Sequence, residues 1–365
     1  MSTVADALAR PHNGFGLLRL ALALAVVVSH GFSVTTGRVA DEPLTGLTGY
    51  TLGEHAVNGF FAISGFLVTM SLDRRGARDY ALARALRILP GLVAAVLAVS
   101  LLLGAALTRL PLDTYWREPG LWRFIAETLT RFRSNGALPG VFSENPFRFP
   151  MGTVWTLKYE ILCYAGLLAA GLAGALSRRW LAPALVAGSF LGLVVLGLQP
   201  APMPKGVETA LRLPLIFSGG AALYLWRDRV RLSWPVALGL LAAALISRGT
   251  ALGPPLLFTA ETYAAIRLAF APALSRPGLD PRADLSYGTY LYGWPVQQSL
   301  CALVPAAGAW QLLPPALLLT LGVAALSWYA VEKPALGLKH RLLGRRPLPA
   351  PQGRRGEAVS RVREG

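Results

Sequence analysis

The chain has 365 residues, of which 54% are hydrophobic and only 15% are charged, so it has too little polar surface to cover a soluble globular protein of this size. Its formal net charge is +16, but the basic residues lie in short loops and the tail without interleaved aromatic side chains, which argues against nucleic-acid binding. The composition therefore predicts a polytopic membrane protein. Cys163 and Cys301 lie in apolar runs without metal-binding spacing, so no metal site is predicted.

Ten apolar segments are long enough to cross a bilayer, and each is predicted to be a helix because a span must satisfy its own backbone hydrogen bonds. They are residues 15–35, 55–73, 82–107, 153–175, 180–199, 208–226, 233–248, 253–272, 285–305 and 311–331. Arginine gathers in alternate loops, which the positive-inside rule assigns to the cytoplasm. The predicted fold class is an all-α polytopic membrane bundle of about ten transmembrane helices with both termini cytoplasmic. Several short segments leave the count open by one or two.

One transmembrane domain is predicted over residues 1–340, followed by a basic tail at 341–365. The tail is rich in Pro, Gly and Arg, which predicts a disordered cytoplasmic extension able to touch anionic lipid. Within the domain, the outside loop 108–152 carries large apolar residues at helical spacing, namely Leu121, Trp122, Ile125, Leu129 and Phe132. Two interpretations stay open: an interfacial helix covering a cavity, or a helix simply packed on the spans.

The first segment carries two ionisable residues, Arg19 and His30, eleven positions apart. At about 100° per residue they share one helix face, about 16 Å apart. Ionisable groups inside a span are costly and mark a functional site by default. The alternative is an arginine that reaches the lipid headgroups and a histidine that is capped by a neighbour.

The second and third segments add an amide and a pair of guanidinium groups. Asn58 begins a stretch of polar and small residues that ends at Gly65. The small residues of this stretch could simply form a helix-packing seam, and Asn58 is the more informative residue. Arg84 and Arg87 lie three residues apart and thus share a face, where two guanidiniums form a fork suited to phosphate oxygens. The alternative is a pair of anchors that contact lipid headgroups.

The fourth segment begins at Trp155 and places Glu160 within an apolar helix. A buried carboxylate needs a partner, and the candidates are Arg19, His30 and Lys158. A histidine beside a carboxylate is the minimal equipment for general base catalysis. A purely structural ion pair is the alternative.

The ninth segment opens with aromatic side chains that carry polar tips: Tyr287, Tyr290 and Trp294. Such side chains suit a sugar-binding wall, but they also suit the aromatic belt at a membrane interface.

Together these motifs resemble the integral-membrane acyltransferase-3 family, the bacterial O-acyltransferases of surface glycans, over residues 14 to 335. Six elements match in the family's order: Arg19 with His30 (R-x10-H), Asn58 to Gly65 (FFxxSGF), Arg84 with Arg87 (RxxR), Trp155 to Glu160 (W-S/T-L-x-x-E), Ser286 to Pro295 (SYSLYLxHxP) and Glu332 to Pro334 (E-R/K-P). Two positions depart from the family: Asn58 stands where Asp is commoner, and Gly293 where many relatives carry histidine. His30 is then the only histidine well inside a predicted span.

The resemblance implies a membrane enzyme of the bacterial inner membrane that moves an acyl group, expected to be acetyl, from cytosolic acyl-CoA to a hydroxyl of a glycan, exopolysaccharide or glycolipid. It implies His30 as general base or transient acyl acceptor with Glu160 as its partner, and Arg19, Arg84 and Arg87 as the donor site. The expected acceptor-binding residues are Asn58, Trp155, Tyr287, Tyr290 and Trp294. The expected partners are the glycan or lipid-linked sugar and membrane lipids, with no metal and no nucleic acid.

A competing interpretation is a membrane transporter or exporter. In that case Arg19, His30 and Glu160 would form a proton or substrate relay. Acyl-CoA separates the two classes, because an enzyme consumes it and a carrier ignores it.

Overall fold

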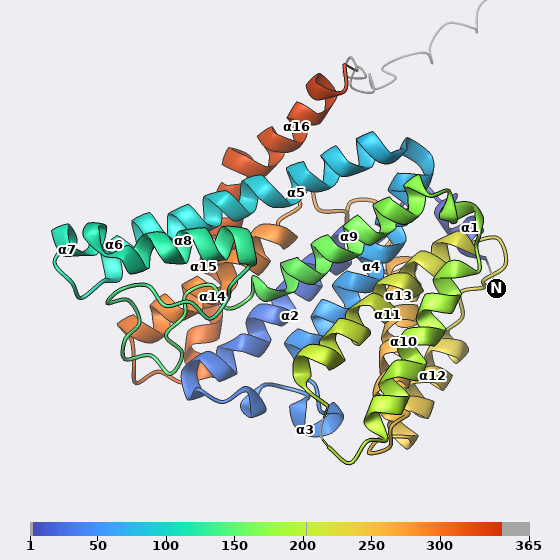
Figure 1. The fold of residues 1–365 in the computed structure, drawn as a ribbon, viewed down its shortest axis with the longest axis horizontal. Coiled ribbons are helices and arrows are strands. Elements are labelled where there is room, and N and C mark those ends of the chain that lie inside the picture. Colours follow the sequence, from blue (N-terminus) through green and yellow to red (C-terminus); the bar gives the residue numbers. More distant parts are fainter. Residues whose placement is uncertain (1–2, 202, 345–365) are drawn as a thin grey trace, which may run out of the picture.

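The computed structural model describes residues 3–201 and 203–344, and this part of the chain is built from helices (Figure 1). The first half contains α1 (Val4–Leu8), α2 (Phe15–Thr36), η1 (Val39–Asp41), α3 (Thr45–Thr48), α4 (Leu52–Arg75), α5 (Ala77–Leu97), the π-helical η2 (Ala98–Leu103), α6 (Gly104–Leu107), α7 (Leu112–Arg117), α8 (Pro119–Arg131) and α9 (Trp155–Leu172). The second half contains η3 (Ala175–Ser177), α10 (Leu181–Gly197), α11 (Lys205–Leu225), α12 (Trp234–Ile246), α13 (Gly253–Ala269), α14 (Ser286–Leu303), α15 (Ala309–Ser327), the π-helical η4 (Trp328–Glu332) and α16 (Lys333–Leu342).

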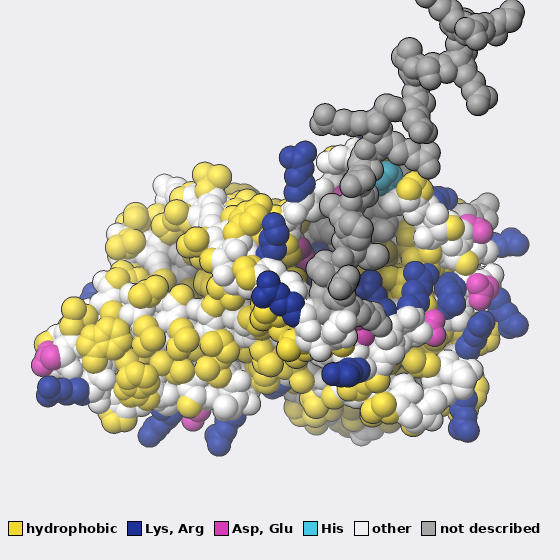
Figure 2. Space-filling model, turned by 90° about the horizontal axis from the view of Figure 1, so that it is seen from above, with side chains coloured by type: hydrophobic (Ala, Val, Ile, Leu, Met, Phe, Trp, Pro, Cys, Tyr) yellow, Lys and Arg dark blue, Asp and Glu magenta, His cyan; other side chains and the backbone are white. Residues whose placement is uncertain are grey.

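The all-helical fold class is confirmed for the described residues. Four helical stretches are long and apolar enough to span a bilayer: Phe15–Thr36, Leu52–Arg75, Ala77–Leu107 and Ala309–Lys339. Figure 2 shows a broad hydrophobic surface on the side of the molecule where α6, α7 and α8 lie in Figure 1, with more Lys and Arg toward the other side. The count of about ten spans and the cytoplasmic position of both termini stay predictions, and the tail from residue 345 on lies outside the described residues.

The centre of the bundle is the contact of α4 with α2 and α11, and glycines allow the closest of these approaches. A Cβ added at Gly65 would lie 1.9 Å from the carbonyl oxygen of Phe217, and one at Gly220 would lie 2.2 Å from that of Ala62. Any larger side chain at either position would force the two backbones apart. Gly65 is therefore a packing residue, in agreement with the seam interpretation of its motif.

The bundle has two ends, an inner end and an outer end. The inner end carries Arg75 and Arg84 near the α4–α5 turn, and the outer end carries His30 and α3. Because α4 begins at the outer end and finishes at the inner end, it runs antiparallel to α2.

The segment between α6 and α9 covers the outer part of the bundle. Helix α8 packs against α5 and buries Leu121, Phe124 and Thr128, while Trp122 on its other side is 54% exposed. The helix in the 108–152 loop therefore packs on α5, as one of the two interpretations proposed. Its location at a membrane interface stays a prediction.

Candidate active site

His30 is paired with a carboxylate that follows its own helix. Glu42 lies just after η1, and its Oε1 is 3.2 Å from His30 Nδ1. The same carboxylate accepts hydrogen bonds from the hydroxyls of Ser29 and Ser33, each 2.5 Å long. Ser29, His30 and Ser33 lie within one turn at the outer part of α2, so a short reversal of the chain brings all three to one acidic side chain.

The Glu42 carboxyl is buried but held in its charged form. Burial alone would raise its pKa, but the contacts from His30, Ser29 and Ser33 more than offset this, so its pKa lies below the usual value. An ionised carboxylate at Nδ1 fixes the ring and stabilises an imidazolium. Within the described part of the chain His30 Nε2 has no hydrogen-bond partner, and the side chain is 22% exposed. One ring nitrogen is thus engaged by a carboxylate, and the other, among the described residues, is open to a ligand.

Trp294 of α14 forms one wall beside His30. The two rings meet edge to face, with centroids 5.0 Å apart. The indole Nε1 donates to the carbonyl oxygen of Phe149 at 2.8 Å, and the Phe149 ring stacks on the indole. The end of the 108–152 loop therefore holds this wall in place at the outer end.

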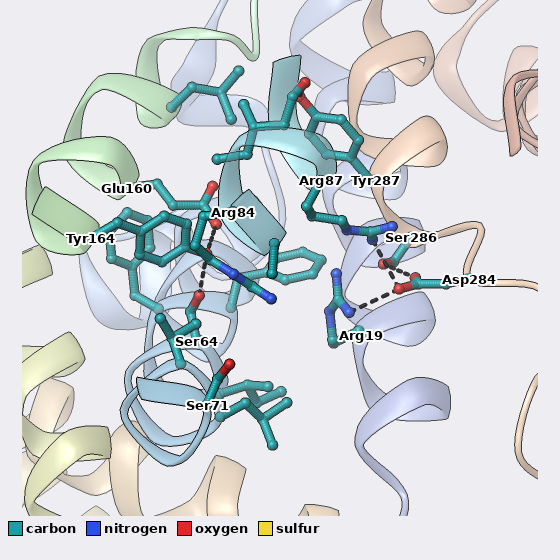
Figure 3. Close-up of a pocket in the computed structure, with 18 of the residues that line it drawn as sticks. Arg19, Ser64, Ser71, Arg84, Arg87, Glu160, Tyr164, Asp284, Ser286 and Tyr287 are labelled. Atoms are coloured by element: carbon teal, nitrogen blue, oxygen red, sulfur yellow. Dashed lines mark hydrogen bonds and ion pairs between the residues drawn. The ribbon is translucent and has the colours of Figure 1, made fainter. Parts of the chain in front are cut away.

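Glu160 lies elsewhere, so the predicted pairing of His30 with Glu160 is wrong. Its carboxylate accepts a hydrogen bond from the hydroxyl of Tyr164, which in turn is 2.7 Å from the Ser64 hydroxyl. These three side chains line a cavity of about 390 Å³ that also contains Arg19 and Arg84 (Figure 3). Glu42 was missed because it stands in a polar loop, outside the apolar segments and outside every motif.

The two arginines of the RxxR pair have different surroundings. Arg87 Nη2 is 2.9 Å from Asp284 Oδ2, and Arg87 Nη1 is 3.5 Å from an oxygen of the buried Glu332. Arg84 forms no ion pair with any carboxylate of the described residues, and its guanidinium lies 5.8 Å from the centre of the Tyr164 ring. Arg84 is therefore the cation available to a ligand, whereas Arg87 is held within the protein.

Arg19 shares the carboxylate of Asp284 with Arg87. Its Nη1 lies 2.9 Å from Asp284 Oδ2 (Figure 3). Burial would raise the pKa of Asp284, but the two guanidiniums lower it well below its usual range. Asp284 precedes α14 and belongs to no motif, so the sequence offered no signal for this contact.

The cavity of 390 Å³, here named the inner cavity, carries an excess of positive charge. Five basic and two acidic side chains line it, namely Arg19, Arg75, Arg84, Arg87 and Lys339 against Glu160 and Asp284. Such a lining suits an anionic ligand. Tyr287 and Tyr290 also line it, and each donates its hydroxyl to a backbone carbonyl oxygen, that of Ile88 and that of Thr153 respectively.

Three of the predicted acceptor-binding residues do not line this cavity: Trp294, which lies beside His30, and Trp155 and Asn58. Trp155 is half-buried against Tyr159, with ring centroids 6.1 Å apart. Asn58 donates a hydrogen bond of 2.6 Å to Glu261 Oε2. Glu261 also pairs with His55 Nδ1, so a second histidine is engaged by a carboxylate at the outer end. His55 stands in the first turn of α4 and is the first residue of the predicted segment 55–73, so it does not lie well inside that segment.

Comparisons with known proteins identify the family of the chain. Residues 12–332 match the family described as "Acyltransferase domain", so the chain belongs to the acyltransferase-3 family and is a multi-pass membrane acyltransferase. It is similar to Nodulation protein 10 of Rhizobium leguminosarum bv. viciae, with 32% identity over 92% of this chain and 96% of that protein. It is also similar to the O-acetyl transferase of Shigella phage Sf6, with 26% identity over 88% of this chain and 95% of that protein. These matches confirm the predicted family and the expected class of O-acetyltransferase. No solved structure matches the chain.

Proposed function

We propose that the protein transfers an acetyl group from acetyl-CoA, bound from the inner end, to a hydroxyl of a glycan, exopolysaccharide or glycolipid at the outer end. The observation that carries the proposal is the length of the inner cavity. Its lining includes both Arg75 and Val57 of α4, which are 18 residues apart, or about 27 Å along the helix. That length is close to the thickness of a bilayer's hydrocarbon core, about 30 Å.

The cavity approaches the level of His30. Gly53 of α4 donates its backbone N–H to Ser29 Oγ at 2.8 Å, so Gly53 and His30 lie at the same depth. Val57 is four residues, or about 6 Å, further along α4. Coenzyme A has its phosphates at one end of a long flexible arm and its thioester at the other. Phosphates beside Arg84 would therefore allow the thioester to extend toward His30.

The chemistry then needs one base and one carbonyl. His30 Nε2 takes the proton of the acceptor hydroxyl while the oxygen of that hydroxyl attacks the acetyl carbonyl carbon. The carbon–sulfur bond breaks, and the departing sulfur takes the proton from the imidazolium to leave as free coenzyme A. Glu42 holds the ring through Nδ1 and stabilises its charged form. A route in which His30 Nε2 itself carries the acetyl group would use the same contacts.

Further support comes from the names of the relatives and from the charges. One relative is called an O-acetyl transferase, which agrees with acetyl as the group transferred. The arginine-rich inner end fits a cytoplasmic face in a bacterial inner membrane. A transporter that uses Arg19, His30 and Glu160 as a relay is disfavoured because Glu160 lines the inner cavity while His30 is paired with Glu42.

The test is acetyl transfer by the purified protein in liposomes. Labelled acetyl-CoA is supplied with the polysaccharide fraction prepared from the envelope of the native cells. The parent protein should place label on the polysaccharide, and His30→Ala protein should not. Retention of all label in acetyl-CoA by well-folded parent protein would contradict the proposal and favour a carrier.

A further inference from the structure

A second cavity lies at the outer end, apart from the inner cavity. It measures about 460 Å³ and is enclosed by residues of the α3–α4 turn, α10, α11 and the α12–α13 loop. Its polar lining includes Thr48, Tyr50, Glu208 and Arg248, set among leucines and small residues. A mostly apolar cavity with a few converging polar groups is the usual form of a small-ligand site. We name it the outer cavity.

The charge of the outer cavity differs from that of the inner one. Glu208 and Arg248 are its only charged lining residues among those described, so its wall is neutral overall. Five basic and two acidic residues line the inner cavity. An anionic donor is therefore matched by the inner cavity, whereas the outer cavity suits a neutral ligand with hydroxyl groups.

A buried polar network fixes one side of the outer cavity. Thr48 Oγ1 lies 2.8 Å from His55 Nε2, and the opposite nitrogen of His55 is engaged by Glu261. Asn58 binds the second oxygen of Glu261. The Thr48 hydroxyl also lies 3.1 Å from the carbonyl oxygen of Leu44 and 3.0 Å from that of Tyr50. The Thr48 hydroxyl is thus held in a defined place on the cavity wall.

A second buried group supports the aromatic part of the wall. Arg212 is completely buried, and its guanidinium lies 5.3 Å from the centre of the Tyr50 ring. It pairs with Glu208 at 3.3 Å and with Glu54 at 3.7 Å. Charged groups inside a span are costly and mark functional sites by default. This network contacts neither the inner cavity nor His30. The free-energy cost of burying its charges therefore indicates a function at the outer cavity.

The outer cavity is joined to His30 by one short segment. This segment comprises residues 39–50. Near one end Glu42 contacts His30, and at the other end Thr48 and Tyr50 line the outer cavity. Leu52 donates its backbone N–H to the carbonyl oxygen of Pro43, which closes this segment into a compact loop. A ligand in the outer cavity therefore touches the same loop that positions the base.

We propose that the outer cavity binds a neutral saccharide portion of the acceptor, with the Tyr50 ring against the sugar's apolar face and Thr48, Glu208 and Arg248 on its hydroxyl groups. This proposal rests on the proposed function and adds the acceptor's binding site to it. An aromatic ring together with a carboxylate and a guanidinium supplies both the apolar and the bidentate contacts that a sugar offers.

The test separates donor from acceptor binding in liposomes, with labelled acetyl-CoA and the envelope polysaccharide fraction as the probe. Arg248→Met removes a cation that could bind the sugar, and Thr48→Val removes the hydroxyl while keeping its shape. Each should raise the KM for polysaccharide about ten-fold or more, because a hydrogen bond to a charged or fixed group is lost. The Kd for acetyl-CoA should stay unchanged, and Thr48→Ser should restore the parent KM.

Arg38→Met is the matched control, because Arg38 is an exposed arginine at the same end that does not line the outer cavity. It should leave both constants unchanged. A parent-like polysaccharide KM in Arg248→Met and Thr48→Val would overturn the proposal, as would an equal loss of acetyl-CoA binding. Activity that survives His30→Ala would contradict the proposed function alone, because the polysaccharide KM of the cavity variants would still report on the site.

Discussion

Nδ1 of His30 lies 3.2 Å from Oε1 of Glu42, a residue outside the helix that carries the histidine. The carboxylate is 4% exposed and is surrounded by three donors, the imidazole and the hydroxyls of Ser29 and Ser33. Such a carboxylate has almost no freedom to turn away from the ring. The pair therefore combines a fixed ring orientation with a second nitrogen that has no partner in the described part of the chain.

His30→Ala should lower acetyl transfer to the polysaccharide by about 10²–10⁴-fold, the range that a general base contributes. The fold should survive, because the Glu42 carboxylate keeps its two hydrogen bonds from the hydroxyls of Ser29 and Ser33. Labelled transfer gives the rate, and size-exclusion chromatography in detergent gives the folding control. Near-parent transfer by a monodisperse variant would show that His30 is not the base.

Replacing Glu42 with Gln should lower the turnover number by about 10- to 100-fold, since a charge-assisted hydrogen bond to the ring is lost while the shape is kept. The KM for acetyl-CoA should change little. Glu160→Gln is the matched comparison, because Glu160 lines the inner cavity and bonds to Tyr164. Its main effect should fall on the donor KM. A larger loss of turnover in Glu160→Gln than in Glu42→Gln would reverse the assigned roles.

The lowered pKa of Glu42 predicts how stability depends on pH. The carboxyl has a lower pKa in the folded protein than in the unfolded chain, so its stabilising effect is complete above the unfolded value of about 4.5. The effect is lost as the pH falls through the folded value. Thermal midpoints of the parent and Glu42→Gln should therefore differ by a constant amount from pH 8 to about 5 and converge in more acidic buffers. A gap that closes already near pH 7 would contradict this.

Six of the site residues predicted from the sequence line the inner cavity, and each belongs to a motif within an apolar segment. Arg19, Arg84, Glu160 and Tyr290 all line it. The sequence did not identify the carboxylates that bind these side chains and His30. Glu42 and Asp284 stand in loops whose path depends on how helices distant in sequence pack, and helical periodicity carries no information on that path.

The same limit explains the outer end. Arg212 lies on α11 and Glu261 on α13, and only the packing of these helices against α4 brings them to Glu54 and His55. Helical periodicity placed Arg84 and Arg87 on one face correctly, but it could not assign different partners to them. Spacing predicts which residues share a face, and tertiary packing decides which of them remain free.

The predicted topology can be tested with reporters fused to the tail. The positive-inside rule and the predicted count of about ten spans predict a cytoplasmic tail. A fusion active only in the cytoplasm should therefore be active, and one active only in the periplasm should be silent. The opposite result would place Arg84 on the wrong side for cytosolic acetyl-CoA.

The last prediction separates the two arginines of the RxxR pair. Arg84 has no carboxylate partner among the described residues, so Arg84→Ala should raise the Kd for acetyl-CoA about 10- to 100-fold while leaving the thermal midpoint near that of the parent. Arg87→Ala removes the partner of Glu332, which is 2% exposed, and part of the support of Asp284. Leaving a buried charge unpaired costs about 3–5 kcal/mol, so this variant should lose thermal stability and yield.

Isothermal titration with acetyl-CoA and thermal unfolding in the same detergent measure the two effects side by side. Arg84→Lys should recover part of the affinity, because it restores the charge without the fork. A double variant, Arg87→Ala with Glu332→Gln, should regain stability over Arg87→Ala alone, since the unpaired charge is then removed. If Arg84→Ala unfolds the protein and Arg87→Ala only weakens acetyl-CoA binding, the free cation has been assigned to the wrong arginine.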